Sequence, residues 1–338
     1  MRSRLTCLLA LALLLTGCTS IIPSIILTSD SCPSTTDTSH QDFGSPDAED
    51  LVIFIHGICG DAKTTWANPI TKFVFPEALA QDFVANNHPA YVVSFDYVTH
   101  LRRGPSILSI ADHLDFKIDQ LLRKHSYRTL SIVAHSMGGL VARQYILRLQ
   151  PQAHPSLKVA GIVLLATPNN GNELSDLGRL VSESRQIEEM RSIDTSNAYL
   201  RSLNADWNRA FIADGHPRKV FLYAGFEEED TKVVGIVVKM SSAILFADEA
   251  LPFPLNHFSI AKPEGRDKDV YIWVKDKLEE SLEKTALKEG NGTVKQGPFP
   301  ATDIREQQVL AGLESERGSQ SQNKMAYHQA ISLRYRNT

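Results

Sequence analysis

A serine stands in a tight turn between a strand pattern and a helix pattern, where it could act as a nucleophile. The apolar segment Leu130-Ser-Ile-Val-Ala precedes the turn, and a helical pattern over Leu140–Leu149 follows it. In Ala134-His-Ser-Met-Gly, small residues stand two positions before and two positions after Ser136. Small side chains at these positions let a strained turn pack closely against its neighbours. A serine in such a turn attacks an ester carbonyl when a nearby base takes its proton.

This turn resembles the nucleophile elbow of the α/β-hydrolase fold, whose usual pattern is Gly-x-Ser-x-Gly between a strand and a helix. Ala134 replaces the first glycine and keeps that position small. The resemblance implies that the chain is a serine hydrolase and that Ser136 is its nucleophile.

A second motif lies directly after the apolar segment Leu51–Ile55. The residues His56-Gly-Ile-Cys-Gly resemble the His-Gly loop of lipases and esterases with this fold. In that fold the loop supplies one backbone N–H of the oxyanion hole, and the residue after the nucleophile supplies the other. The resemblance therefore implies Ile58 and Met137 as the two donors and leaves His56 with a structural role. Leu165-Ala-Thr-Pro-Asn-Asn-Gly is similar to a further turn of the same lipases.

The general base must be a histidine that follows the last strands, because the fold orders its triad as serine, acid, histidine. His216 precedes the apolar segment Lys219–Ala224, and His328 lies in a polar C-terminal region. His257 lies in a loop before the last helical pattern, in a segment similar to one of these lipases. We therefore predict His257 as the catalytic base.

The acid of the triad is expected shortly after the segment that begins at Lys219. An acidic run follows that segment, and a Val-Val pair at Val233 comes after it. Related enzymes often place an aspartate ahead of such a pair, so we predict Asp230 as the acid. The alternatives that stay open are Glu227, Glu228, Glu229, Asp248 and Glu249, with Asp96 as a further possibility.

Short apolar segments alternate with helical patterns over residues 51–285. Nearly continuous apolar runs are typical of buried parallel strands, and their alternation with helices predicts a mostly parallel, doubly wound α/β sheet with helices on both faces. This is the α/β-hydrolase fold that the motifs imply, with a small cap insertion at about 172–216. The predicted strands are Leu51–Ile55, Ala90–Phe95, Leu130–Ala134, Gly161–Ala166 and Lys219–Ala224, and the predicted helices are Ile107–Leu122, Leu140–Leu149 and Val270–Leu282.

The N-terminal residues have the features of an export signal. Two arginines precede the apolar run Leu8–Leu15, which is too short to cross a membrane as a helix. Leu15-Thr-Gly-Cys resembles the bacterial lipobox, which implies a signal peptide at 1–17 and lipidation of Cys18 with palmitate-type chains. Thr19, in place of aspartate, favours the outer membrane of the cell envelope. A soluble secreted protein cleaved near Gly17 is the alternative.

Two polar regions flank the predicted catalytic domain. Residues 18–50 are rich in Ser, Thr, Asp and Pro, which predicts a tether, and residues 286–338 predict a flexible C-terminal tail. After removal of the signal and lipidation of Cys18, Cys32 and Cys59 remain. Whether these two thiols pair is left open.

The composition narrows the function further. The 338 residues carry a net charge of −4 with no dense basic run, so nucleic-acid binding through bulk charge is not expected. No cofactor or metal is expected, because acyl transfer through a serine requires none. We predict a serine carboxylic-ester hydrolase of the lipase, esterase or phospholipase type, acting on an ester or lipid. An acyltransferase with the same triad and a catalytically inactive lipoprotein scaffold are the alternatives.

Overall fold

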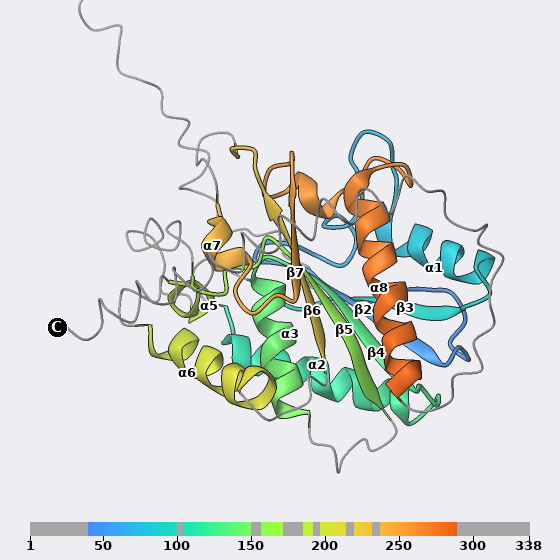
Figure 1. Cartoon of the computed structure of the whole chain (residues 1–338), viewed down its shortest axis with the longest axis horizontal. Helices are drawn as coiled ribbons and strands as arrows, with labels where there is room; N and C mark the ends of the chain where they lie inside the picture. The colour runs from blue at the N-terminus through green and yellow to red at the C-terminus, as the bar shows by residue number, and fades with distance from the viewer. Residues whose placement is uncertain are drawn as a thin grey trace, which may run out of the picture. The chain divides into compact units, whose positions relative to one another are not determined.

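The chain forms a seven-stranded sheet in the order β1-β3-β2-β4-β5-β6-β7 (Figure 1). The computed structural model describes residues 40–99, 104–149, 157–171, 185–191, 197–213, 220–231 and 237–288. Neighbouring strands are parallel, except that β1 runs antiparallel to β3 at one edge. This arrangement confirms the predicted α/β-hydrolase fold. The strands are β1 (Gln41–Phe43), β2 (Asp50–Ile55), β3 (Ala90–Phe95), β4 (Thr129–His135), β5 (Lys158–Leu165), β6 (Phe221–Glu227) and β7 (Glu249–Phe253).

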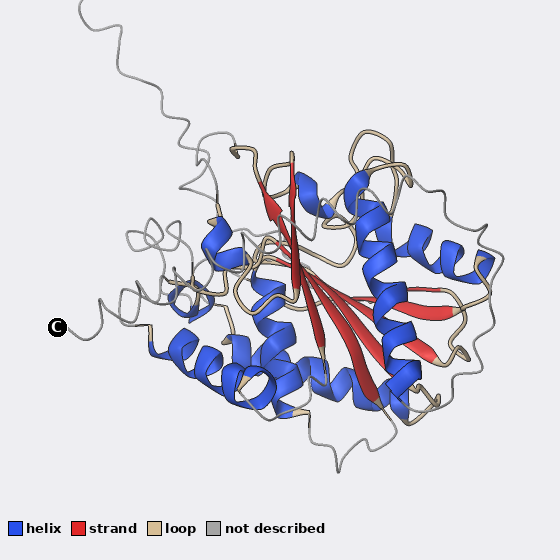
Figure 2. Ribbon diagram, in the orientation of Figure 1, coloured by secondary structure: helices blue, strands red, loops and turns tan. Residues whose placement is uncertain are grey.

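Helices cover both faces of the sheet (Figure 2). The apolar side chains of α1 (Phe75–Ala85) and α8 (Asp269–Lys288) form one core cluster with the strands. Those of α2 (Ile107–Leu122), α3 (Met137–Arg148) and α6 (Ala198–Trp207) form a second cluster on the opposite face. The remaining helical elements are α5 (Arg185–Glu189), the π-helical turn η4 (Asn208–Ile212), α7 (Met240–Ala243) and the 3-10 turn η5 (Ser259–Ala261).

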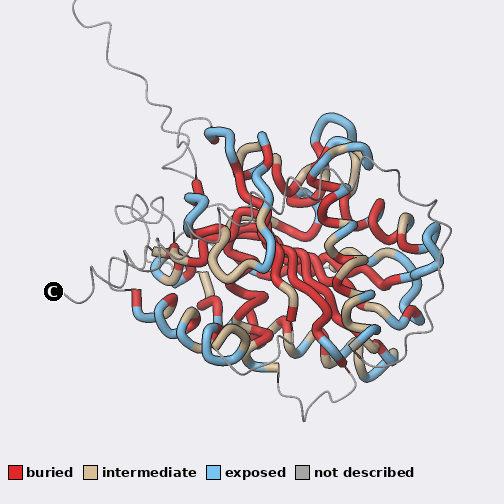
Figure 3. Tube along the Cα trace, in the orientation of Figure 1, coloured by how far each residue is buried: buried red, intermediate tan, exposed pale blue. Residues whose placement is uncertain are grey.

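The second strand shows why the sequence is nearly continuously apolar. Successive side chains of a strand point to opposite faces, so Leu51, Ile53 and Ile55 join one cluster, while Val52 and Phe54 join the other. Both faces are covered by helices, and every one of these side chains is at most 1% exposed. Figure 3 shows the same burial along the central strands.

Two boundaries of the predicted domains differ from the structure. The predicted tether extended to residue 50, but β1 belongs to the sheet and pairs with β3 through Gln41 and Ser94. A strand of three residues has too little periodic pattern to predict. At the other end, α8 continues to Lys288, three residues beyond the predicted end of the catalytic domain.

The predicted signal peptide, the predicted lipidation site Cys18 and the chain beyond Lys288 lie outside the described residues. Among the helices that the structure describes, none is long and apolar enough to cross a membrane.

Candidate active site

Ser136 stands between the end of β4 and the start of α3. Its backbone has φ 54° and ψ −127°, a strained conformation that persists when surrounding structure enforces it. Ser136 N–H donates to the carbonyl of Leu165 at 2.9 Å. A Cβ at Gly138 would lie 2.3 Å from the carbonyl oxygen of Ile55, so this position requires glycine. The turn therefore has the shape of the predicted nucleophile elbow.

His257 contacts the nucleophile directly. Its Nε2 lies 3.1 Å from Ser136 Oγ, and both residues are 4% exposed. The loop that carries His257 follows β7 and is held by Asn256, whose side-chain oxygen accepts the N–H groups of Phe258 and Ser259 at 3.0 and 3.1 Å. The structure thus brings together the two side chains that the sequence predicts as nucleophile and base.

The carboxylate beside His257 belongs to Glu227, not to the predicted Asp230. Glu227 Oε1 lies 3.4 Å from His257 Nδ1. Glu227 is the last residue of β6 and is 3% exposed, whereas Asp230 is exposed in the loop beyond. The prediction ended this strand at Ala224, but the strand runs three residues further, so its carboxyl end falls on Glu227. The choice of Asp230 is corrected accordingly.

The contact between Glu227 and His257 leaves hydrogen-bonding capacity on both side chains. Glu227 Oε1 also accepts the N–H of Val238 at 2.5 Å. Among the described residues, neither Glu227 Oε2 nor His257 Nδ1 has a hydrogen-bond partner. Catalytic hydrogen bonds are often long in a free enzyme and tighten when substrate binds. The carboxylate is therefore close enough to His257 to form a hydrogen bond after a small movement of either side chain.

The other candidate acids lie elsewhere. Glu228 and Glu229 are exposed, and their N–H groups donate to the carbonyls of Phe253 and Leu255 at 3.0 and 3.2 Å. Asp248 and Glu249 lie at the amino end of β7, opposite to the edge of the sheet that carries Ser136. Asp96 lies 3.2 Å from His56 Nε2.

The predicted oxyanion donors are the backbone N–H groups of Ile58 and Met137. Ile58 lies in the loop that packs against Ser136, and Met137 follows Ser136 in the sequence. Met137 is the first residue of α3, so its N–H has no acceptor inside the helix. Ile58 follows Gly57, where a Cβ would lie 2.8 Å from Ser136 Cβ and 3.3 Å from its Oγ. The close approach of this loop explains the glycine in the His-Gly motif.

His135 is a member of the site that no sequence signal identified. Its Nε2–H donates to the carbonyl of His257 at 2.8 Å, and the two rings lie 4.9 Å apart. Burial lowers the pKa of His135 to about 3, so the ring stays neutral at ordinary pH. His135 occupies the variable position before the nucleophile, where a histidine alone indicates nothing about its partner.

Cys59 is disulfide-bonded, and its N–H donates to Thr99 Oγ1 at 3.0 Å. Every other cysteine of the chain lies outside the described residues, so the pairing of Cys32 with Cys59 stays a hypothesis.

The model of one family, described as "Domain of unknown function (DUF7379)", matches residues 27–239, which is more than half of the chain. The chain belongs to the DUF7379 family. The matched region includes the His-Gly loop, the elbow and Glu227, and it ends before His257.

Curated relatives include Protein SERAC1 of Bos taurus and of Homo sapiens. The first is 26% identical over 270 residues, and the second is 25% identical over 263 residues. Each match covers 69% of this chain and 39% of the relative. The chain therefore spans about two fifths of the length of the curated relatives it matches.

Similar solved structures include a lipase and a phospholipase. Mature Bacillus licheniformis lipase BlEst2 is 16% identical with a TM-score of 0.48, and the match covers 70% of this chain and 98% of that one. Phospholipase PlaB from Legionella pneumophila is 14% identical with a TM-score of 0.48, covering 72% of this chain and 63% of that one. The fold assignment rests on the strand order and the elbow of this chain itself.

Proposed function

We propose that this chain is a serine hydrolase of carboxylic esters that works through an acyl-enzyme on Ser136. The observation that carries the proposal is the line of side chains at the carboxyl edge of the sheet. Ser136 Oγ lies 3.1 Å from His257 Nε2, and His257 Nδ1 lies 3.4 Å from Glu227 Oε1. Acyl transfer requires a nucleophile in contact with a base, and a base in contact with an acid that orients it. These three side chains are arranged in that order.

In the proposed reaction, Ser136 Oγ attacks the ester carbonyl while His257 Nε2 takes the hydroxyl proton. The carbonyl oxygen becomes an oxyanion, and the N–H groups of Ile58 and Met137 donate to it. The C–O bond to the alcohol then breaks, and His257 returns the proton to the leaving alcohol. A water molecule, deprotonated by His257, attacks the acyl-enzyme; its collapse releases the acid and restores the Ser136 hydroxyl.

Glu227 replaces Asp230 as the proposed acid of the triad. A carboxylate at Nδ1 keeps the proton on that nitrogen and leaves Nε2 free to accept from Ser136. It also stabilises the imidazolium that forms during attack. Burial of Glu227 in the sheet strengthens this interaction, because water does not screen it.

An apolar acyl chain is the proposed occupant of the surface beside the triad. Phe258 follows the base directly and is 57% exposed, while Ile58 is partly exposed next to the nucleophile. Apolar side chains at these two positions suit an ester or lipid substrate.

Attachment through Cys18 at the bacterial cell envelope is also part of the proposal. It is supported by the lipobox-like quartet and by the disulfide at Cys59, because disulfides persist in oxidising compartments such as the periplasm.

The direct test combines hydrolysis of short- and long-chain p-nitrophenyl esters with fluorophosphonate labelling of the purified protein. We expect the wild type to hydrolyse esters and to be labelled, and Ser136→Ala to lose both properties. Ser131→Ala is the matched control, because Ser131 is a buried serine of β4, the strand that leads to Ser136, and its hydroxyl has no described partner. Labelling that survives in Ser136→Ala, or an unlabelled wild type, would contradict the proposal.

A further inference from the structure

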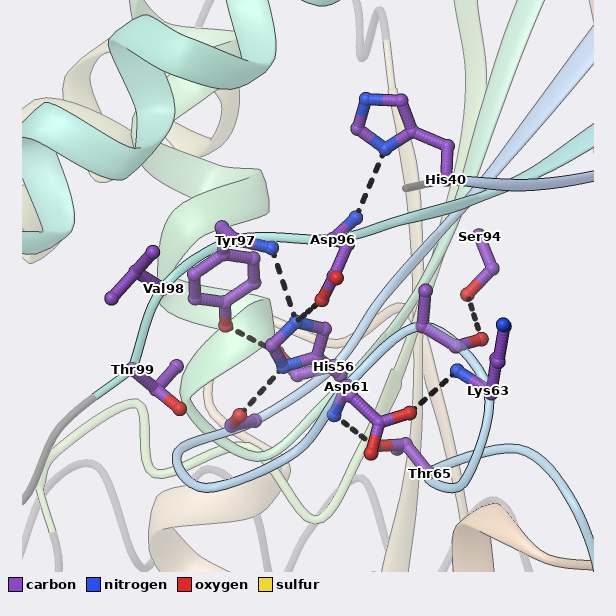
Figure 4. Close-up of polar contacts among 12 residues, drawn as sticks. His40, His56, Asp61, Lys63, Thr65, Ser94, Asp96, Tyr97, Val98 and Thr99 are labelled. Atoms are coloured by element: carbon purple, nitrogen blue, oxygen red, sulfur yellow. Dashed lines mark hydrogen bonds and ion pairs between the residues drawn. The ribbon is translucent and has the colours of Figure 1, made fainter. Parts of the chain in front are cut away.

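A second histidine–carboxylate pair lies beneath the loop that carries Ile58. His56 and Asp96 are 0% and 2% exposed, and His56 Nε2 lies 3.2 Å from Asp96 Oδ1. Figure 4 shows Asp96 at the edge of the His56 ring and the ring of Tyr97 beside it. The proposed hydrolysis uses neither side chain of this pair, although both are ionisable and fully enclosed.

We propose that His56 and Asp96 are positioning residues that hold the Gly57–Ile58 peptide in the orientation that presents the Ile58 N–H to the reacting carbonyl oxygen. This inference rests on the proposed hydrolase function and assigns a role within the same site.

The argument begins with the peptide itself. His56 Nδ1 lies 2.8 Å from the carbonyl oxygen of Gly57. That carbonyl and the N–H of Ile58 belong to one planar trans peptide, so they point in opposite directions. A hydrogen bond to the carbonyl therefore fixes the direction of the Ile58 N–H. The N–H of Gly60 donates to the same oxygen at 3.1 Å, which supports the same orientation.

Proton placement links Asp96 to this bond. A peptide carbonyl only accepts hydrogen bonds, so Nδ1 of His56 must carry a proton to bind Gly57. Nε2 then faces Asp96 Oδ1 at 3.2 Å and the N–H of Tyr97 at 3.4 Å, and these two contacts hold that edge of the ring. Asp96 thereby holds the ring in the plane that Nδ1 needs.

Tyr97 fixes the ring and its backbone. The rings of His56 and Tyr97 stack with centroids 4.0 Å apart and planes 7° apart. The Tyr97 hydroxyl donates to the carbonyl of His56. Cys59 N–H donates to Thr99 Oγ1. Residues that follow β3 therefore contact the loop that carries Ile58 at several points.

A buried histidine–carboxylate pair contributes little net stability, because desolvation offsets most of the attraction between the two side chains. Stability alone therefore does not explain why these two residues stand here, because an apolar pair of similar volume would stabilise the fold equally well. An apolar pair would not bind the Gly57 carbonyl, whereas His56 does.

The test compares His56→Leu, which has no donor for Gly57, with His56→Asn, whose amide can replace Nδ1. Reactive sites are counted by exhaustive fluorophosphonate labelling, so that kcat refers to competent protein only. Loss of one oxyanion donor lowers kcat by about 10²- to 10³-fold. We expect His56→Leu to lower kcat by roughly 10- to 10³-fold with little change in KM, and His56→Asn to recover most of that loss.

A second measurement separates positioning from general damage. A trifluoromethyl ketone forms an oxyanion on Ser136, whereas an ether analogue of the ester does not. We expect His56→Leu to weaken binding of the ketone by the same factor by which it lowers kcat/KM, and to leave binding of the ether unchanged. Asp96→Asn keeps an acceptor for the ring and should retain more activity than Asp96→Val.

Tyr127→Phe is the matched control, because it removes a buried hydroxyl that donates to the Pro46 carbonyl at 3.1 Å and has no contact with His56, Asp96 or the Gly57–Ile58 peptide. It should lower the melting temperature and leave kcat per labelled site unchanged. The inference would be overturned, and the hydrolase proposal would stand, if His56→Leu kept kcat within about threefold of wild type. The same holds if its affinities for the ketone and for the ether fell equally. If His56→Leu does not fold, the comparison of Asp96→Asn with Asp96→Val decides on the same readouts. A wild type that neither hydrolyses esters nor labels would remove the hydrolase proposal itself.

Discussion

Replacement of Glu227 by glutamine tests the assignment of the triad acid. The change removes one negative charge 3.4 Å from His257 Nδ1 and keeps the length of the side chain. The glutamine oxygen can still accept the N–H of Val238, so the end of β6 should keep its fold. The amide nitrogen can then donate to Nδ1, which would leave the ring proton on Nε2. In that tautomer His257 cannot accept the Ser136 proton.

The size of the effect follows from the geometry. At an effective dielectric constant of about 20, two unit charges about 3.4 Å apart interact with about 5 kcal/mol. Each ~1.4 kcal/mol of lost transition-state stabilisation is a tenfold loss of rate, so kcat should fall by roughly 10³- to 10⁴-fold. Asp230 is exposed. Even at ~6 Å, a carboxylate in water contributes only about 0.7 kcal/mol, so Asp230→Asn should cost about threefold at most.

The assay is the steady-state hydrolysis of a p-nitrophenyl ester, with reactive sites counted by fluorophosphonate. Thermal unfolding of each variant confirms that the fold is intact. Glu227→Asp keeps the charge on a shorter side chain and should retain more activity than Glu227→Gln. The reasoning fails if Glu227→Gln keeps more than about a tenth of the activity, or if Asp230→Asn loses more than Glu227→Gln does.

Three further predictions concern other parts of the chain. The pKa of His135 is lowered to about 3, so between about pH 6.5 and pH 3 the unfolded chain binds more protons than the folded chain. The free energy of unfolding therefore falls as the pH falls, by up to about 1.4 kcal/mol per pH unit. Denaturant titrations of His135→Phe should show a free energy of unfolding that depends less steeply on pH. Arg143 donates to Asn169 and Asn204 at 2.9 Å each, so Arg143→Lys should lower the free energy of unfolding by about 1–3 kcal/mol in urea titrations. Cys18→Ser should be released from the membrane fraction or stay uncleaved, and normal processing with normal membrane partition would contradict the lipid anchor.

The neighbouring side chains Ser136 and His257 could both be selected from the sequence, because local chemistry constrains the residues around them. Ser136 needs small residues on either side of a strained turn, and a Cβ at Gly138 would collide with the Ile55 carbonyl. His257 could be found by position, because it is the histidine between the last strands and the last helix. In both cases a short stretch of sequence contains the constraint.

The carboxylate beside His257 could not be selected in the same way, because its identity depends on where β6 ends. The predicted strand ends at Ala224, but Gly225, the next residue, lies inside β6. A Cβ there would approach Leu165 at 2.9 Å and Phe253 at 3.0 Å, so glycine is required by packing against neighbouring strands. Pairing with β7 extends to Glu227 opposite Phe253. β7 was not predicted, because three of its five residues are exposed and one is proline, so its sequence lacks the apolar run of a buried strand.

Three histidines near the nucleophile differ in function because their partners differ. His56 faces the Gly57 carbonyl and Asp96, so both ring nitrogens are occupied and neither can take a proton from substrate or serine. His135 donates to the His257 carbonyl in a site where burial opposes a charge, so a second cation does not form beside the base. Only His257 has one nitrogen on the Ser136 hydroxyl and the other beside a carboxylate. In the proposed hydrolysis the Ser136 proton therefore goes to His257, and the proposed role of the His56 ring is to hold the Gly57–Ile58 peptide.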